Sequence, residues 1–263
     1  MIDSHCHIDP TVFGGDEGVD AVVARAHAAG VERMLCVGSG YGFASAERAV
    51  TVAKRHPSVR ASVGLHPHDA KDFSPARFAE LLAMAAEPEV LALGEMGLDF
   101  HYDSSPRDQQ RMAFREQLRA AQRLRMPVII HDRDSGGETL AILDEEATWE
   151  TGVLFHCYTG DVPYMQQIVA RGGYISIPGI VTFKNAGIMP EVARLVPADR
   201  ILIETDSPFL TPVPHRGKKN EPAYVAFTLA KVAELRGADL REFEVLTTEN
   251  TERFFGWARS ALS

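Results

Sequence analysis

The sequence begins with MIDSHCHID (residues 1–9), a short apolar stretch in which one residue separates two histidines, His5 and His7. The stretch is typical of a β-strand, in which alternate side chains point to the same face. We therefore predict that His5 and His7 point one way, and that Ser4, Cys6 and Ile8 point the other way. Two imidazoles that converge on one point predict a metal site if other strands supply further ligands.

Seven more strand-like runs follow this first one, and segments with helical periodicity separate them. The eight predicted strands are Met1–Ile8, Val31–Val37, Val59–Gly64, Val90–Gly94, Pro127–Ile130, Gly152–Phe155, Gly173–Ser176 and Arg200–Ile203. The last two predicted helices are Pro222–Leu235 and Leu240–Trp257. Strands that alternate with amphipathic helices pair in parallel through right-handed crossovers.

Eight such units in 263 residues favour an α/β fold of the closed (β/α)8 type, the TIM barrel. We predict one single-domain barrel over residues 1–263. An open doubly wound sheet is the alternative. It is weakened because no GxGxxG opens the first helix and no GxxxxGK[ST] occurs.

The composition limits the classes of function. A net charge of -9 argues against a protein that coats nucleic acid non-specifically. The segment HRGKKNEP (residues 215–222) is a local exception, because it holds Arg216, Lys218 and Lys219.

The expected compartment is the cytoplasm. No apolar run approaches the ~18 to 20 residues of a membrane span, and Asp3 and His5 stand where a secretory signal needs basic and apolar residues. The three cysteines form no CxxC pair and leave one unmatched, which fits a reducing compartment. The sequence indicates neither a membrane contact nor an obligatory protein partner.

Metal-binding residue types recur where the predicted strands end, and in this type of barrel the chemistry lies at those ends. They are His5 and His7, His66 and His68, Glu95 and Asp99, His131, His156, and Asp206. We predict a metal centre formed by His5, His7, Glu95, His131, His156 and Asp206.

Six nitrogen and oxygen ligands exceed what one catalytic ion takes while it keeps positions open for water and substrate, so we predict two divalent ions. Glu95 is predicted to bridge them. His5, His7 and Asp206 would hold one ion, and His131 and His156 the other. Zn²⁺, Mn²⁺ and Mg²⁺ all suit this mixed set.

Nearly the whole chain resembles the TatD family of metal-dependent deoxyribonucleases, a branch of the amidohydrolase-like TIM barrels. The matching stretches lie within residues 3–225 and are DSHCHID, VGLHPHDA, LGEMGLDFHYD, VIIHDRDS, FHCYTGD, SIPGIVTFKNA and ETDSPFLTPVPHRGKKNEPAYV. The six predicted ligands match the ligand positions of the family one by one. The family commonly has HxRDA or HxREA after strand five, whereas this chain has HDRDS, with Asp132 and Ser135. This departure removes no ligand and bears on substrate preference and metal affinity.

The resemblance implies a hydrolase that cuts phosphodiester bonds in DNA, in single strands or at frayed ends, from the 3′ end. For such cleavage two metal ions can activate a water, orient the phosphate and neutralise charge on the leaving oxygen. We predict that Asp206 and Glu95 are the catalytic residues, and that Asp206 also accepts the proton of the water.

His66, Arg133 and Arg216 are the predicted substrate contacts, with Lys218 and Lys219 as further candidates, because cationic and hydrogen-bonding groups hold phosphates. Each has an alternative role. His66 could be a turn residue, Arg133 could pair with Asp134 or Glu138, and the basic loop could be a solvated surface.

Two further sets of residues follow strands four and six. Phe100, Tyr102 and Tyr158 could stack on unpaired bases or pack in the core. Asp99 and Asp103 could orient the ligand histidines, or they could cap the helix that begins near Pro106.

Two other classes of function stay open. The first is a hydrolase of carboxyl esters, lactones, cyclic amides or aminoacyl-tRNA esters on the same barrel. Amide-cleaving relatives often bridge their ions with a carbamylated lysine, and no lysine occurs near the ends of strands four and five. The second is a non-catalytic barrel that binds metal or DNA.

Overall fold

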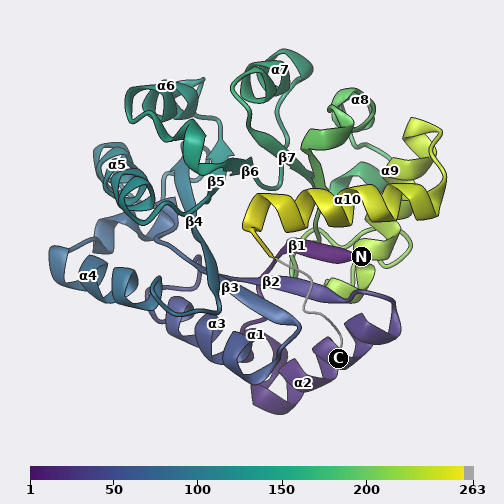
Figure 1. The fold of residues 1–263 in the computed structure, drawn as a ribbon, viewed down its shortest axis with the longest axis horizontal. Coiled ribbons are helices and arrows are strands. Elements are labelled where there is room, and N and C mark those ends of the chain that lie inside the picture. Colours follow the sequence, from purple (N-terminus) through teal and green to yellow (C-terminus); the bar gives the residue numbers. More distant parts are fainter. Residues whose placement is uncertain (258–263) are drawn as a thin grey trace.

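The structure is a computed structural model that describes residues 1–257, so residues 258–263 of the predicted domain lie outside the described part. Eight parallel strands form one sheet in the order β1 to β8, and helices surround it (Figure 1). The strands are β1 (Ile2–Cys6), β2 (Arg33–Gly38), β3 (Val59–Val63), β4 (Val90–Asp99), β5 (Val128–Arg133), β6 (Val153–Phe155), β7 (Tyr174–Ile177) and β8 (Ile201–Ile203). The predicted (β/α)8 TIM barrel is confirmed.

Ten α-helices occur within residues 1–257, and most of them link consecutive strands. They are α1 (Pro10–Phe13), α2 (Gly15–Ala28), α3 (Ala44–Arg55), α4 (Pro75–Met84), α5 (Arg107–Leu124), α6 (Glu138–Glu145), α7 (Val162–Ala170), α8 (Met189–Leu195), α9 (Val225–Arg236) and α10 (Leu240–Phe255). Among these described helices, none is long and apolar enough to cross a membrane.

The seam between the last strand and the first is held by two backbone hydrogen bonds. Asp206 N–H donates to His5 O at 3.0 Å, and His7 N–H donates to Ser207 O at 2.8 Å. Both bonds involve residues at or just beyond the carboxyl ends of β1 and β8. The closure of the barrel therefore brings Asp206 beside His5 and His7.

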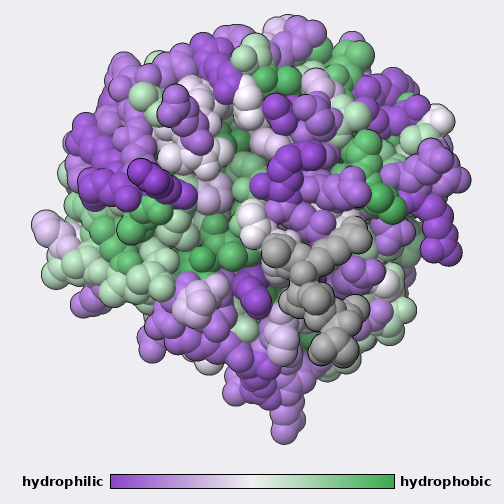
Figure 2. All heavy atoms as spheres, in the orientation of Figure 1, coloured by the Kyte–Doolittle hydropathy of each residue, from purple (hydrophilic) through white to green (hydrophobic). Residues whose placement is uncertain are grey.

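The opposite end of the barrel is filled with apolar side chains. Residues near the starts of the strands, such as Ile2, Leu35 and Ile129, form a buried cluster with Phe255 and Trp257. Helix α10, which ends at Phe255, lies across this end in Figure 1. Hydrophilic side chains dominate the same face in Figure 2, with smaller hydrophobic patches between them. The amino-terminal end is thus closed, and the carboxyl end is left for a site.

Two strand boundaries differ from the predicted ones in ways that affect the site. The fourth strand does not end at Gly94 but continues to Asp99, so Glu95 lies in the middle of β4. The first strand ends at Cys6, and its pairing with β2 shifts between Asp3 and Cys6. This shift interrupts the simple alternation of faces.

Ser4 shows the effect of the shift. Cys6 and Ile8 join the hydrophobic core as predicted, whereas Ser4 Oγ lies 3.1 Å from Ser176 Oγ on β7. The predicted common direction of Ser4, Cys6 and Ile8 is therefore not kept at Ser4, because an irregular strand does not keep a strict period of two.

Candidate metal centre

A cavity of about 1210 Å³ opens at the carboxyl ends of the strands. His7, Glu95, His131, His156 and Asp206 all line it. The sixth predicted ligand, His5, is fully buried, and its ring stacks on that of His156 with centroids 3.8 Å apart. The structure thus brings all six predicted ligands together from strands that are far apart in the sequence.

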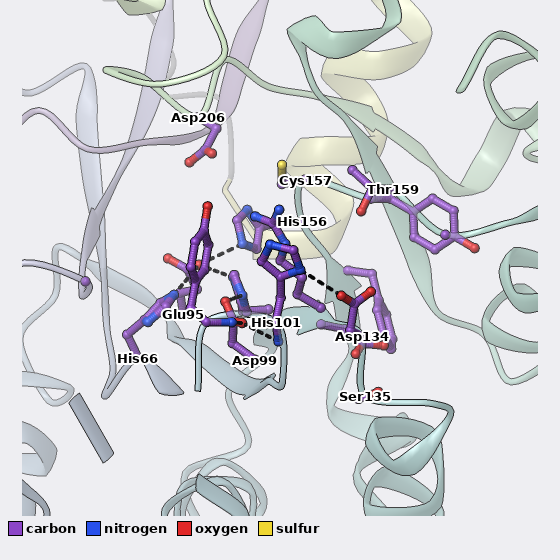
Figure 3. Close-up of a pocket in the computed structure, with 18 of the residues that line it drawn as sticks. His66, Glu95, Asp99, His101, Asp134, Ser135, His156, Cys157, Thr159 and Asp206 are labelled. Atoms are coloured by element: carbon purple, nitrogen blue, oxygen red, sulfur yellow. Dashed lines mark hydrogen bonds and ion pairs between the residues drawn. The ribbon is translucent and has the colours of Figure 1, made fainter. Parts of the chain in front are cut away.

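One oxygen of Glu95 faces three histidines. Glu95 Oε1 lies 2.8 Å from His156 Nε2, 3.0 Å from His131 Nδ1 and 3.3 Å from His66 Nε2. Figure 3 shows the Glu95 carboxylate between His66 and His156, with dashed lines for these contacts.

The other oxygen of Glu95 faces the first strand. Glu95 Oε2 lies 3.7 Å from Nε2 of both His5 and His7. Asp206 Oδ1 approaches the same two nitrogens, at 3.7 Å from His5 and 3.6 Å from His7. The two oxygens of one carboxylate therefore point into two different sets of ligand atoms.

A bulge in β4 presents Glu95 to the cavity. Gly94 pairs with Ile129 and Met96 pairs with Ile130, so Glu95 is an extra residue without a partner on β5. Ser39 fixes this residue, because its hydroxyl accepts from Glu95 N–H at 3.4 Å and donates to Glu95 Oε2 at 3.2 Å. Bulges of this kind re-aim a side chain next to a site.

Burial and charge set the protonation of the cluster. Burial alone would raise the pKa of Glu95, but the charge of His156 and the hydrogen bonds from His131 and His156 hold it well below its ordinary value. Burial lowers the pKa of His66 to about 4 and lowers that of His5 well below its ordinary value. A neutral imidazole offers the lone pair that a metal ion needs.

Orphaned nitrogen atoms show that a metal fits this cluster. Both ring nitrogens of His5 and of His156 are buried and make no hydrogen bond within residues 1–257, although His156 Nε2 is close to Glu95. Buried polar atoms normally have partners, and a cation among these nitrogens and the nearby carboxylates would satisfy them. Ligand atoms lie within 4.8 Å of one another in three groups, which are His5, His7 and Asp206; His66, Glu95 and His131; and His5, His156 and Glu204.

Only one of the two predicted ligand sets recurs among these groups. The set of His5, His7 and Asp206 recurs as predicted, whereas His131 groups with His66 and Glu95 rather than with His156. His66, predicted to contact substrate, lies beside Glu95 within the cluster itself.

Glu204 was missed by the sequence analysis. It is fully buried, directly follows β8, and its Oε1 lies 3.7 Å from His156 Nδ1. The signal that could have revealed it is a carboxylate immediately after an apolar strand and two residues before Asp206.

Of the two carboxylates proposed to orient histidines, Asp99 has the geometry for that role. Its Oδ2 accepts hydrogen bonds from His68 Nε2 at 2.8 Å and from His131 Nε2 at 3.0 Å. Burial would raise the pKa of Asp99, but these bonds lower it below its ordinary value. Asp103 instead pairs with Arg107 at the surface.

Of the two arginines predicted to contact substrate, one lies at the cavity and the other does not. Arg133 lines the cavity, with its guanidinium 4.8 Å from the centre of the Tyr102 ring. Arg216 lies outside the cavity, because its guanidinium covers Phe183 at 3.8 Å and donates to Thr211 O at 3.0 Å. The role of Arg216 in substrate binding stays a prediction.

Only some of the other basic and aromatic candidates lie at the cavity. Lys218 is exposed, and the Lys219 ammonium donates to Val12 O at 2.7 Å. Tyr102 and Tyr158 line the cavity, whereas Phe100 packs beneath the guanidinium of Arg107 at 4.3 Å. Four aromatic side chains that were not predicted also line it, and they are Tyr41, Phe155, Tyr164 and Phe209.

Comparison with known proteins gives a consistent result. The family model described as "TatD related DNase" matches residues 2–256. An uncharacterized metal-dependent hydrolase, YabD of Bacillus subtilis, is 39% identical over 255 residues, which cover 97% of this chain and 98% of that protein. A 3′-5′ ssDNA/RNA exonuclease, TatD of Salmonella typhimurium, is 38% identical over 261 residues, which cover 97% of this chain and 98% of that protein.

A solved structure agrees with these relatives. The crystal structure of YJJV, a TatD homolog from Escherichia coli, superposes with a TM-score of 0.90 at 29% identity and covers 98% of both chains. Because the family model matches residues 2–256, nearly the whole chain, this protein belongs to the TatD-related DNase family.

Proposed function

We propose that the protein is a metal-dependent hydrolase that shortens single-stranded DNA from its 3′ end. The position of Glu95 carries this proposal, because its two oxygens face two different sets of ligand atoms, as a carboxylate between two cations does. The names of relatives add support, since one is called a 3′-5′ ssDNA/RNA exonuclease.

The proposed ligands are the six predicted from the sequence. His5, His7 and Asp206 would hold one divalent ion. His131 and His156, which both lie within 3.0 Å of Glu95 Oε1, would hold the other, and Glu95 would contact both. When bound, such ions lower the pKa of a water molecule and neutralise charge on a phosphate.

Asp206 is the proposed proton acceptor. It lines the cavity while its Oδ1 faces His5 and His7, so a water molecule in the cavity comes within its reach. A carboxylate so placed can take the proton of the attacking water as the phosphodiester bond breaks.

Arg133 and His66 are the proposed contacts of the phosphate. A guanidinium can donate two parallel hydrogen bonds to phosphate oxygens, and Arg133 carries one at the cavity wall. His66 is proposed for its place in the cavity wall, where its Nδ1 accepts from His68 N–H at 3.1 Å and its Nε2 lies 3.3 Å from Glu95 Oε1, so a phosphate held at the metal centre would be its neighbour.

The test is digestion of a single-stranded oligonucleotide by the purified protein with Mg²⁺, Mn²⁺ or Zn²⁺. Labels at the 5′ and the 3′ end report the polarity, and we expect a 5′-labelled ladder that shortens from the 3′ end. Asp206→Asn should slow cleavage by at least about 100-fold, in line with the usual contribution of a general base. The matched control is Glu191→Gln, which changes an exposed carboxylate on α8 and should cleave at the wild-type rate.

Intact DNA with every metal would contradict the proposal, as would an unchanged rate in Asp206→Asn. The first result would direct the assay to carboxyl-ester and aminoacyl-ester substrates.

A further inference from the structure

Two aromatic rings stand together at one wall of the cavity. Tyr41 follows β2 and Phe209 follows β8, and their rings are nearly parallel, with an interplanar angle of 7° and centroids 6.3 Å apart. Both residues line the cavity. Phe209 is 50% exposed, which is unusual for a phenylalanine beside a buried cluster.

The pair lies directly beside the proposed metal centre. The Tyr41 ring is 5.6 Å and the Phe209 ring 6.4 Å from the ring of His7, each at 73° to it. A group stacked on this pair would therefore be a neighbour of a phosphate bound near His7 and Asp206.

The backbone on both sides of Phe209 is fixed although its ring is exposed. Phe209 N–H donates to Asp206 O at 2.9 Å, and Asn220 Nδ2 donates to Phe209 O at 2.5 Å. The ring is thus presented to the cavity by a segment that is tied to Asp206. A preorganised aromatic face costs little conformational entropy when a ligand covers it.

The other exposed aromatic side chain of the cavity is already engaged. Tyr102 is 58% exposed, but Arg133 lies over its ring at 4.8 Å, and His101 meets it edge-on at 4.8 Å.

Tyr158 and Tyr164 also lie nearly parallel in the wall, at 16° with centroids 6.4 Å apart, but Tyr158 is buried and the Tyr164 hydroxyl donates to Asp132. Phe155 is buried as well. Among the described aromatic residues that line the cavity, Tyr41 and Phe209 are therefore the better placed to receive a flat ligand.

We infer that Tyr41 and Phe209 form a stacking site for the nucleobase next to the bond that is cut. This inference rests on the proposed function and adds to it a base-binding subsite. Every base has a π-face, so stacking favours the presence of a base without selecting its identity. It also favours unpaired ends, because a base inside a duplex has both faces covered.

The test compares oligonucleotides that differ only by one base. One has an ordinary 3′ end, and two others carry an abasic tetrahydrofuran residue at the terminal or at the penultimate position. For the wild-type protein we expect kcat/KM to fall on the order of 10-fold for one of the two abasic positions, which is the scale of one base–aromatic stack. In Phe209→Leu and Tyr41→Leu this difference should shrink to below about 2-fold, because the ring face is lost.

Conservative variants separate stacking from general damage. Phe209→Tyr and Tyr41→Phe keep a ring and should keep the discrimination of the wild type. Phe227→Leu is the matched control, because Phe227 lies on α9 and packs on His215 and Tyr224 outside the cavity. A second measurement needs no turnover, since an oligonucleotide with 2-aminopurine at the favoured position should lose fluorescence on binding to the wild type with Ca²⁺ and retain it with Phe209→Leu.

The outcomes distinguish the inference from the proposed function. A wild-type protein that cuts all three oligonucleotides equally well would overturn the stacking site and leave the nuclease standing. A wild-type protein that cuts none of them would overturn the nuclease. Discrimination that survives in both leucine variants would also overturn the stacking site.

Discussion

Glu204 is a fully buried residue that lies beside His156 of the candidate metal centre. Its Oε1 accepts from Cys157 N–H at 2.5 Å and lies 3.7 Å from His156 Nδ1, while its Oε2 has no hydrogen-bond partner among the described residues. Burial raises the pKa of this carboxyl. A carboxylate behind an imidazole fixes the orientation of the ring and increases its basicity toward a metal.

The first prediction concerns this carboxylate. We expect Glu204→Gln to weaken the binding of Mn²⁺ or Zn²⁺ by roughly 10- to 100-fold, because an amide supports the histidine less well than a carboxylate. Isothermal titration calorimetry of the metal-free protein measures the affinity directly, without an activity assay.

Glu191→Gln is the control for the loss of one negative charge. It should bind metal as the wild type does, because Glu191 is exposed on α8. Equal affinities for wild type and Glu204→Gln would show that the residue does not support His156.

The bulge of β4 is the element on which the site depends most. Glycines precede and follow the bulged residue, with φ of 134° at Gly94 and 145° at Gly97. A Cβ at Gly97 would lie 1.9 Å from His131 O. The close approach of β4 and β5 therefore requires glycine at this position.

The second prediction follows from this contact. Gly97→Ala should destabilise the protein by at least about 2 kcal/mol, because the strained backbone and the clash with His131 O have to be relieved together. Chemical denaturation followed by circular dichroism measures the change in the free energy of unfolding.

Gly237→Ala gives the cost of an ordinary left-handed glycine position without a close approach. Gly237 has a φ of 61°, and a Cβ there would meet no described residue within 4 Å. We expect a cost of about 1 kcal/mol for this variant. A similar cost for both variants would contradict the importance of the close approach.

The elements also show what the sequence could predict. The alternation of apolar runs with helical patterns was enough to predict the eight strands. Each strand is buried on both faces, so its own residues form an apolar run. The length of β4 could not be predicted, since a bulge depends on the register with β5 and not on the strand's own pattern. The six predicted ligands could be selected because they lie within strands or just after them, near the ends where the site was expected. Tyr41 and Phe209 meet only through the paths of two loops.

At the scale of the molecule, the proposed ligands come from almost the full length of the barrel. His5 and His7 belong to the first strand segment and Asp206 follows the last. A metal that binds all three would hold the two ends of the sheet together, and the unfolded chain has no such site.

The third prediction is therefore a metal-dependent stability. At a free metal concentration of 100 times Kd, binding should add about 2.7 kcal/mol to the free energy of unfolding, and the melting temperature should fall when EDTA removes the metal. Differential scanning calorimetry with and without Mn²⁺ measures the shift.

Asp206→Asn is the comparison for this experiment, because it weakens one proposed ligand. Its melting temperature should rise less when metal is added. A wild-type melting temperature that does not respond to any of the three metals would contradict a metal centre at the seam.

The direction of the Arg216 side chain also depends on how the whole molecule packs. Its loop follows β8 and so begins at the end of the barrel that carries the site, as the sequence indicated, yet the guanidinium turns to Phe183 and Thr211. Sequence order fixes the end of the barrel at which a loop begins. The direction of a long side chain depends on neighbours that are remote in the chain.

The hydrogen bonds between Asp206 and His5 and between His7 and Ser207 have a consequence for synthesis on the ribosome. The histidines emerge first, and their partners emerge only after most of the chain has been translated. An incomplete chain that lacks residues beyond 203 has neither the seam nor Asp206. Under the proposed function, fragments that end before Asp206 would therefore be inert, and the metal centre could form only after about four-fifths of the chain has been made.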